Sequence, residues 1–377
     1  MKFMTKIARP TTPEIDQAVA SVWERVLGVP ARRGDQLLDV LAGSFGAVRS
    51  QKLGRLLSEI GAATGVHLPL TVAFGSPTAE ALADMVRRRE WPAYVRPVRM
   101  KSAVGRPLFV LPGLGAMGLD VVELIRHLSF PGSIYLCQPQ GIDGKPPHDT
   151  LEATVADHVR VIRAVQPNGP YWLLGYSWGG VVALEIARAL RASDQAVGFV
   201  GMIDPVVSET NWPYSAWLGY MKDRVRHHVK VLRQVTSLRS ALSYGNKLLV
   251  PLVGRTSRWL GFTRWQPLVT EADILPVPLP ALWAAELKVI EGYRMQYYDG
   301  KVTYFAMNSG HAASCDPEKL WLPRVRLLDL KWLPCDHYFG PSVKNTADMI
   351  TTIMLQSGEH TQSSEPAEHY VGARDVA

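Results

Sequence analysis

Hydrophobic positions divide the chain into a helical first part and a longer part in which strands and helices alternate. Over residues 13–87, apolar residues recur every three or four positions, which is the spacing of amphipathic helices. This spacing predicts one helix after Pro13, a second around Leu56 and a third that begins near Thr78. A small all-α bundle is therefore expected at the start of the chain.

From Pro107 onward, short and mainly apolar runs alternate with helical patterns. Runs of this kind are typical of strands that a parallel sheet buries on both faces. The predicted strands are Leu108–Leu111, Ile134–Leu136, Tyr171–Leu174, Val197–Ile203, Val302–Met307 and Val325–Leu330. Because helical stretches separate most of these runs, the pattern predicts an α/β domain over residues 107–356, with helices on both faces of a parallel sheet.

Three segments depart from these two patterns. Residues 88–106 are basic and contain prolines, which predicts a solvated linker between two domains. Residues 206–290 interrupt the strands with a helical, aromatic and basic stretch. Residues 357–377 are polar with few apolar positions, so they are predicted to be disordered.

Composition and charge narrow the function classes. With 377 residues, 47% of them hydrophobic, the chain can build one large core and one small one. We interpret the formal net charge of +7 as a basic surface and expect no nucleic-acid partner. No run of about 18 uncharged apolar residues is present, and the first residues lack the apolar core of a signal peptide. Three scattered cysteines predict neither a disulfide framework nor a zinc site, so a cytoplasmic protein without a metal or a membrane partner is expected.

The segment Trp172–Gly180 carries the strongest chemical signal. Its apolar run ends in Gly-x-Ser-x-Gly-Gly, and a helical pattern follows from Val181. This is the layout of a nucleophile elbow, a sharp strand-to-helix turn that presents a serine hydroxyl, here that of Ser177. The backbone N–H of Trp178 would then face the oxygen of a substrate carbonyl. The alternative is an ordinary glycine-rich turn.

A serine nucleophile needs a histidine base and an acid that orients it. Asp204 is the candidate acid, because it ends the strand after the elbow helix, and parallel strands bring their carboxyl ends to one sheet edge. His337 is the candidate base, since it follows the last apolar run. His311, after the preceding run, is the competing histidine, and Asp204 could instead be a turn residue before Pro205.

A second glycine motif follows the first predicted strand. Gly113-x-Gly115-x-x-Gly118 matches a dinucleotide fingerprint, which expects an acidic residue at the end of the next strand. Cys137 and Gln138 stand there instead. Beside a nucleophile elbow, such a loop donates the other N–H group of an oxyanion hole, and we favour this interpretation.

Longer phrases carry a family resemblance. They are Pro107–Gly113, Gln138–Gly144, Ile162–Tyr171, Gly175–Gly180 and Tyr297–Val302. On these phrases, residues 107–355 resemble the thioesterase domain of nonribosomal peptide and polyketide synthases, an α/β-hydrolase. The resemblance implies a triad of Ser177, Asp204 and His337, with Leu114 and Trp178 as oxyanion-hole donors. It also implies a helical lid at residues 206–290, whose basic side could be a solvated face, meet a phosphopantetheine phosphate or an acidic carrier, or lie on a membrane.

The helical first part resembles an acyl or peptidyl carrier protein in two phrases, Val22–Val29 and Gly65–Thr78. In that family a serine at the start of the second helix carries a covalent phosphopantetheine arm. Ser44 matches this serine best, although the two residues before it depart from the family pattern, and Ser50 is the alternative. A vestigial carrier without an arm also stays open.

Together these expectations predict a serine thioesterase that releases an acyl, peptidyl or polyketide chain from a phosphopantetheine carrier, by hydrolysis or cyclisation. The expected partners are the acyl thioester substrate and either upstream synthase modules or a separate carrier that acts in trans. Two alternatives stay open: an acyltransferase with the same triad, and a docking protein without activity. By the same resemblance, the chain is expected to be a free-standing or terminal fragment of an assembly line.

Overall fold

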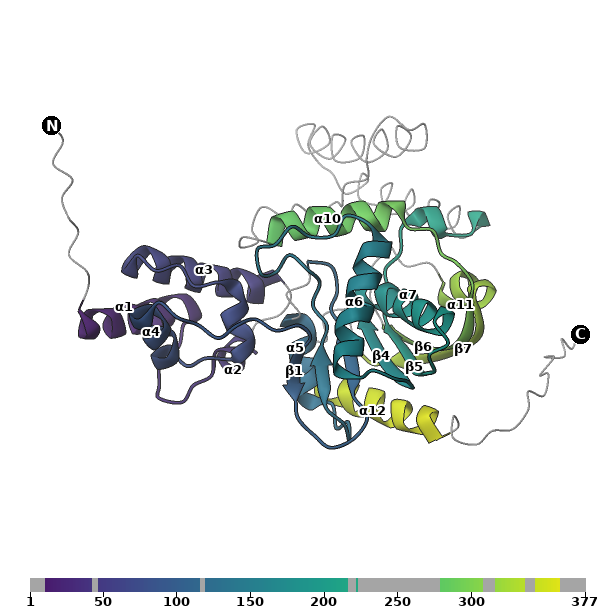
Figure 1. Cartoon of the computed structure of the whole chain (residues 1–377), viewed down its shortest axis with the longest axis horizontal. Helices are drawn as coiled ribbons and strands as arrows, with labels where there is room; N and C mark the ends of the chain where they lie inside the picture. The colour runs from purple at the N-terminus through teal and green to yellow at the C-terminus, as the bar shows by residue number, and fades with distance from the viewer. Residues whose placement is uncertain are drawn as a thin grey trace, which may run out of the picture.

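The computed structural model describes residues 11–42, 47–115, 119–215, 222, 279–307, 316–335 and 343–359. In these ranges, a unit of helices lies beside a sheet that helices flank on both faces (Figure 1). None of the helices in the described ranges combines the length and the apolar character that a membrane span requires.

The N-terminal unit is all-α in its described residues. Its α-helices are α1 (Thr12–Leu27), α2 (Leu37–Leu41), α3 (Ala47–Thr64) and α4 (Ala79–Arg88), and a 3-10 helix, η1, spans Leu70–Gly75. The predicted helices correspond to α1, α3 and α4. The short α2 gave no periodic signal, because five residues are too few to show a helical repeat. α4 begins where the Thr78 side chain accepts a hydrogen bond from the backbone N–H of Ala81 at 3.2 Å.

The sheet has seven strands in the order β1-β3-β2-β4-β5-β6-β7. They are β1 (Val98–Lys101), β2 (Leu108–Leu111), β3 (Ile134–Leu136), β4 (Tyr171–Tyr176), β5 (Val197–Ile203), β6 (Tyr298–Met307) and β7 (Val325–Leu333). All neighbouring pairs from β3 to β7 are parallel, which confirms the predicted α/β class. β1 pairs antiparallel with β3 at the edge of the sheet.

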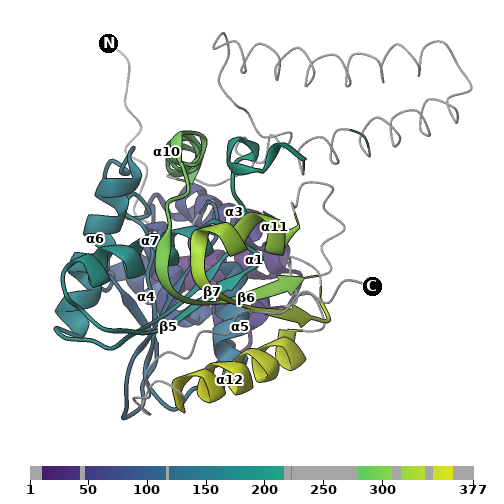
Figure 2. The same cartoon turned by 90° about the vertical axis from the view of Figure 1, so that its right-hand side faces the viewer.

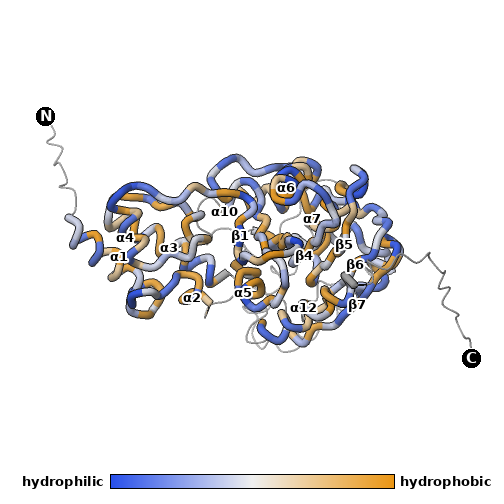
Figure 3. The backbone as a smooth tube through the Cα atoms, turned by 60° about the horizontal axis from the view of Figure 1, so that its bottom comes forward, coloured by the Kyte–Doolittle hydropathy of each residue, from blue (hydrophilic) through white to orange (hydrophobic). Residues whose placement is uncertain are grey.

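Helices cover both faces of the sheet (Figures 1 and 2). One face packs against α5 (Leu119–His127) and α12 (Val343–Glu359), and the other against α6 (Leu151–Val165), α7 (Trp178–Ala192) and α11 (Pro317–Trp321). Side chains of β2 alternate between the two cores, as those of any strand do: Leu108 and Val110 join the first, Phe109 and Leu111 the second. Figure 3 shows the resulting concentration of hydrophobic positions along the central strands.

The segment between the two units differs from its prediction as a solvated linker. Its second half includes β1, and the side chain of Arg96 is only 10% exposed. The Arg96 guanidinium donates to the carbonyl of Gln138 at 2.9 Å and pairs with Asp157 of α6. β1 carries basic residues and is only partly buried, so it has no apolar run that would mark it as a strand.

The helical unit also contacts the sheet domain directly. Arg49, at the start of α3, is 4% exposed and donates to the carbonyls of Leu41 and Ala42 within its own unit. It also donates to the carbonyl of Leu119, the first residue of α5. Nearby, Asp39 of α2 pairs with Arg126 of α5. Arg49 therefore links the two units through backbone acceptors on both sides.

Residues 357–359 belong to the end of α12, so the predicted disordered tail begins three residues too early. The remainder of that tail lies outside the described residues. In the predicted lid, the described structure consists mainly of a 3-10 helix, η2 (Glu209–Asn211), and α10 (Leu279–Gly292). α10 is apolar on average and lies over the sheet domain (Figure 1).

Candidate active site

Ser177 occupies the sharp turn between β4 and α7. Its φ of 53° and ψ of −125° lie in a region that residues with a side chain rarely adopt. Two backbone hydrogen bonds hold this conformation: the Ser177 N–H donates to the carbonyl of Ile203 at 2.8 Å, and the Ser177 carbonyl accepts from Gly180 at 2.9 Å. The strained serine conformation that the Gly-x-Ser-x-Gly pattern predicts is therefore present.

Glycines allow the backbone segments around Ser177 to approach one another. A Cβ atom added at Gly179 would lie 2.2 Å from the carbonyl oxygen of Pro112, and one at Gly175 would lie 2.1 Å from the carbonyl oxygen of Gly179. Both obstacles are backbone atoms, which cannot rotate aside as a side chain can. The first residues of α7 therefore pack directly against the end of β2.

This close approach places the turn after β2 next to the serine. A Cβ atom at Gly113 would lie 3.2 Å from the Cβ of Ser177. Leu114, a predicted oxyanion-hole donor, follows directly and is half-buried. The other predicted donor, Trp178, is the first residue of α7, where backbone N–H groups have no partner within the helix. Both backbone segments thus lie beside the serine, as an oxyanion hole requires.

Asp204 lies at the same edge of the sheet. It follows the last residue of β5, is 8% exposed and has a φ of 41°. Its N–H donates to the carbonyl of Phe305 in β6 at 2.9 Å. The backbone N–H of Ser177 donates to Ile203, the residue just before Asp204. The structure therefore places the backbones of the predicted nucleophile and the predicted acid next to each other.

The remaining predicted residues are not placed. His337 and its competitor His311 lie outside the described residues, and so does Ser44. β7, which pairs with β6, ends at Leu333, four residues before His337 in the sequence. Ser50, the alternative arm site, lies in α3 and is 9% exposed.

The predicted lid segment contributes a residue that the sequence pattern did not single out, Glu286 of α10. Its carboxylate accepts a hydrogen bond from the backbone N–H of Gly115 at 2.7 Å. The Glu286 side chain is partly exposed where it lines a small pocket, and protein atoms surround the rest of it. This desolvation raises the pKa of Glu286 to about 8, against the lowering effect of the Gly115 hydrogen bond. An acidic residue that directly follows the apolar run Leu282–Ala285 was the signal that could have identified it.

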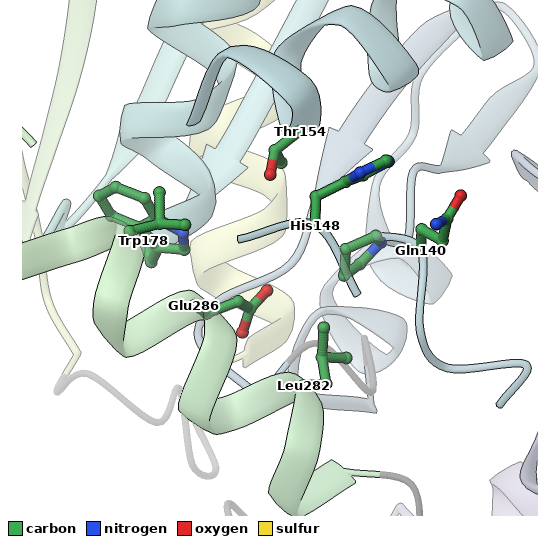
Figure 4. Close-up of a pocket in the computed structure, with 8 residues that line it drawn as sticks. Gln140, His148, Thr154, Trp178, Leu282 and Glu286 are labelled. Atoms are coloured by element: carbon green, nitrogen blue, oxygen red, sulfur yellow. The ribbon is translucent and has the colours of Figure 1, made fainter. Parts of the chain in front are cut away.

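The pocket beside Glu286 is lined by polar and apolar groups (Figure 4). Gln140, His148 and Thr154 contribute polar side chains, and Trp178 and Leu282 contribute apolar surface. Because Trp178 directly follows Ser177, the pocket borders the turn between β4 and α7. Among the residues that the structure describes, no group of three or more histidine, cysteine or acidic side chains could hold a metal ion.

Comparison with known proteins gives a consistent picture. A family model described as the thioesterase domain matches residues 106–354. Indigoidine synthase from Streptomyces lavendulae is 32% identical over 195 residues, which are 51% of this chain and 15% of the synthase. A dimodular nonribosomal peptide synthase from Bacillus subtilis is 31% identical over 201 residues, 52% of this chain and 8% of that protein. The chain therefore spans only a small part of the length of these relatives.

One solved structure aligns with nearly the whole chain. It is the crystal structure of a four-domain nonribosomal peptide synthetase bound to AMP and glycine. The alignment covers 94% of this chain and 27% of that one, with a TM-score of 0.51 and 20% sequence identity. At this identity the similarity is one of fold, and its coverage means that it includes helices of the N-terminal unit as well as the sheet domain.

Proposed function

The chain belongs to the thioesterase family, and from this premise we propose that it releases an acyl or peptidyl chain from a phosphopantetheine carrier through an acyl-enzyme on Ser177. The observation that carries the proposal is the strained turn at Ser177, with the backbone of Gly113 and Trp178 beside it. The relatives named indigoidine synthase and dimodular nonribosomal peptide synthase support a carrier-bound thioester as the substrate class.

In the proposed first step, the hydroxyl oxygen of Ser177 bonds to the thioester carbonyl carbon while the imidazole of His337 accepts the hydroxyl proton. The N–H groups of Leu114 and Trp178 stabilise the negative oxygen of the tetrahedral intermediate. The carbon–sulfur bond then breaks, and the departing thiolate takes the proton from the imidazolium. Asp204 orients the imidazole throughout, and an acyl ester on Ser177 remains.

The second step determines the product. Attack by water on the ester frees a carboxylic acid, whereas attack by a hydroxyl or amine within the acyl chain frees a lactone or a lactam. An external nucleophile would instead make the protein an acyltransferase. Mass spectrometry of the products, with and without an added acceptor, separates these three outcomes.

The decisive test is covalent labelling of the serine. Ser177→Ala should abolish the mass increase from a fluorophosphonate and lower the turnover of an acyl N-acetylcysteamine thioester by at least about 10³-fold. The matched control is Ser193→Ala, which removes an exposed serine at the end of α7 and should keep both activities. Equal labelling of wild type and Ser177→Ala would contradict the proposal.

We also propose that Asp204 is the acid of the triad. Asp204→Asn should leave the fold and the labelling site intact but lower the turnover number by about 10³- to 10⁴-fold, because an amide favours the wrong imidazole tautomer. Steady-state kinetics on a protein with unchanged thermal unfolding check this expectation. A loss of less than about tenfold would remove Asp204 from the triad.

The helical unit is proposed to be a carrier with its arm on Ser44. The fold alignment with a synthetase supports this assignment, and burial of Ser50 makes the alternative less accessible. Incubation with coenzyme A and a phosphopantetheinyl transferase should add one arm to wild type and to Ser50→Ala, but none to Ser44→Ala. No mass increase in any of them would mean that a separate carrier delivers the substrate.

A further inference from the structure

α10 contacts the turn after β2 at two points. The backbone N–H of Gly115 donates to Oε2 of Glu286 at 2.7 Å. One helical turn earlier, Trp283 covers the same glycine, because a Cβ atom added at Gly115 would lie 2.6 Å from Cε3 of the indole ring. Glu286 and Trp283 are three residues apart and therefore share one face of α10. The φ of 77° at Gly115 adds a second reason for glycine here.

The end of α10 is anchored independently on the elbow helix. The hydroxyl of Tyr293, just after α10, donates to Glu185 of α7 at 2.8 Å. The same ring packs edge-on against Trp178, with the ring centroids 5.8 Å apart. Asn211 adds hydrogen bonds to the Tyr293 carbonyl at 3.1 Å and from the Met295 N–H at 2.9 Å. α10 thus joins the two backbone segments that flank Ser177.

The contacts of Gly113 and Gly115 fix the backbone on both sides of Leu114. On one side of Leu114, Gly113 packs against Ser177, and on the other side the N–H of Gly115 is occupied by Glu286. Gly115 therefore donates to Glu286, and Leu114, the proposed oxyanion donor, lies between these two contacts. Without Glu286, the backbone N–H of Gly115 would lose this hydrogen bond to α10.

The chemistry of Glu286 suits a structural acceptor better than an acid or a base. Burial raises the pKa of Glu286 to about 8, so the group is mostly neutral at pH 7 and avoids the cost of a buried charge. In either protonation state a carboxyl oxygen can accept the Gly115 N–H. In Figure 4 the carboxylate lies beside the pocket that Trp178 and Leu282 also line.

We propose that Glu286 is a positioning residue, which holds the turn of Gly113–Gly115 so that the Leu114 N–H points at the oxyanion. This inference rests on the proposed function, because it assigns a role within that reaction. It also makes the oxyanion hole dependent on α10: when α10 is displaced, the turn loses both its carboxylate and its indole contact.

The test compares four variants of the full chain. Glu286→Ala and Glu286→Asp withdraw the acceptor, and Glu286→Gln keeps a carbonyl oxygen of the same reach. Glu152→Ala, an exposed glutamate of α6, is the matched control. The rate of fluorophosphonate labelling is measured, together with kcat and KM on an acyl N-acetylcysteamine thioester. Thermal unfolding identifies any variant that fails to fold.

The expected result is a fall in kcat of roughly 10- to 100-fold in Glu286→Ala and Glu286→Asp, with KM within about twofold of wild type. Glu286→Gln and Glu152→Ala should match wild type. If Glu286→Ala fails to fold, the comparison of Glu286→Asp with Glu286→Gln decides. Equal kcat in these two variants, with wild type fully labelled, overturns the role of Glu286 alone. Failure of wild type to label at all overturns the proposed function itself.

Discussion

At the scale of single residues, the site depends on how closely backbone segments approach. Gly179 and Gly175 have no room for even one added carbon, because the nearest atoms belong to the backbone of β2 and α7. Ser177 in turn keeps a positive φ because β5 and α7 form hydrogen bonds with its backbone. Strain of this kind persists only where the surroundings hold it in place.

Gly179→Ala should therefore disturb the elbow itself. A methyl group 2.2 Å from the Pro112 carbonyl forces the backbone apart, and we expect a loss of about 1–3 kcal/mol in the free energy of unfolding. Fluorophosphonate labelling should slow by at least about tenfold, since the proposed oxyanion donors would move. The control is Gly292→Ala, at the end of α10, where nothing lies within 4 Å of the added carbon. Equal effects of the two substitutions would refute the packing argument.

At the scale of elements, α6 carries a buried polar group that couples stability to pH. His158 is 2% exposed, and burial, with a contribution from Arg96, lowers its pKa to about 3. Beside it, burial would raise the pKa of Asp157, but hydrogen bonds from Arg96 and Arg160 outweigh this and lower it. Both shifts make the unfolded chain the better proton acceptor, so stability falls with acid in each case.

The two groups act in different pH windows. The unfolded chain protonates His158 near its ordinary value of 6.5, and the folded chain only near 3. Between about pH 6 and 4, wild type should therefore lose about 1.4 kcal/mol of stability per pH unit from this residue. Asp157 contributes only below the ordinary aspartate value of 3.8.

His158→Phe should remove this dependence of the free energy of unfolding on pH. Urea unfolding at several pH values between about 4.5 and 7 measures it, with the free energy of unfolding extrapolated to water. The variant should be nearly independent of pH in this range, apart from contributions shared with wild type. Parallel curves for the two proteins would show that His158 is not the responsible group.

At the scale of the whole molecule, the two units are joined by a buried cation. Arg49 reaches from α3 to carbonyl groups on both sides of the contact, while the neighbouring pair of Asp39 and Arg126 is largely exposed. Exposed ion pairs contribute little, whereas unsatisfied buried carbonyls are costly. In the sequence, the proposed arm site Ser44 lies five residues before Arg49.

Arg49→Leu should release the helical unit from the sheet domain. Three carbonyls lose their donor, and we expect the free energy of unfolding to fall by roughly 2–4 kcal/mol. Small-angle scattering should show a larger radius of gyration, and proteolysis in residues 88–97 should accelerate. Asp39→Asn breaks only the exposed ion pair, so it should change neither the radius of gyration nor the rate of proteolysis by much. An unchanged radius in Arg49→Leu would argue against a fixed contact.

Much of the fold was predictable because it follows from local pattern. Mainly apolar runs identified the parallel strands, helical spacing identified most helices, and the Gly-x-Ser-x-Gly motif marked the strained turn at Ser177. The position of Asp204 followed from the rule that parallel strands end at one edge. The triad histidine and the arm serine remain predictions, since both lie outside the described residues.

The sequence by itself therefore determined the class of fold and the placement of Ser177 and Asp204, because hydrophobic period and glycine spacing act over a few residues. Only the tertiary structure decided which distant groups meet. Gly115 and Glu286 are 171 residues apart, Arg49 and Leu119 are 70 apart, and β1 becomes a strand only by pairing with β3. These contacts join segments that are far apart in the chain, and no local periodicity encodes them.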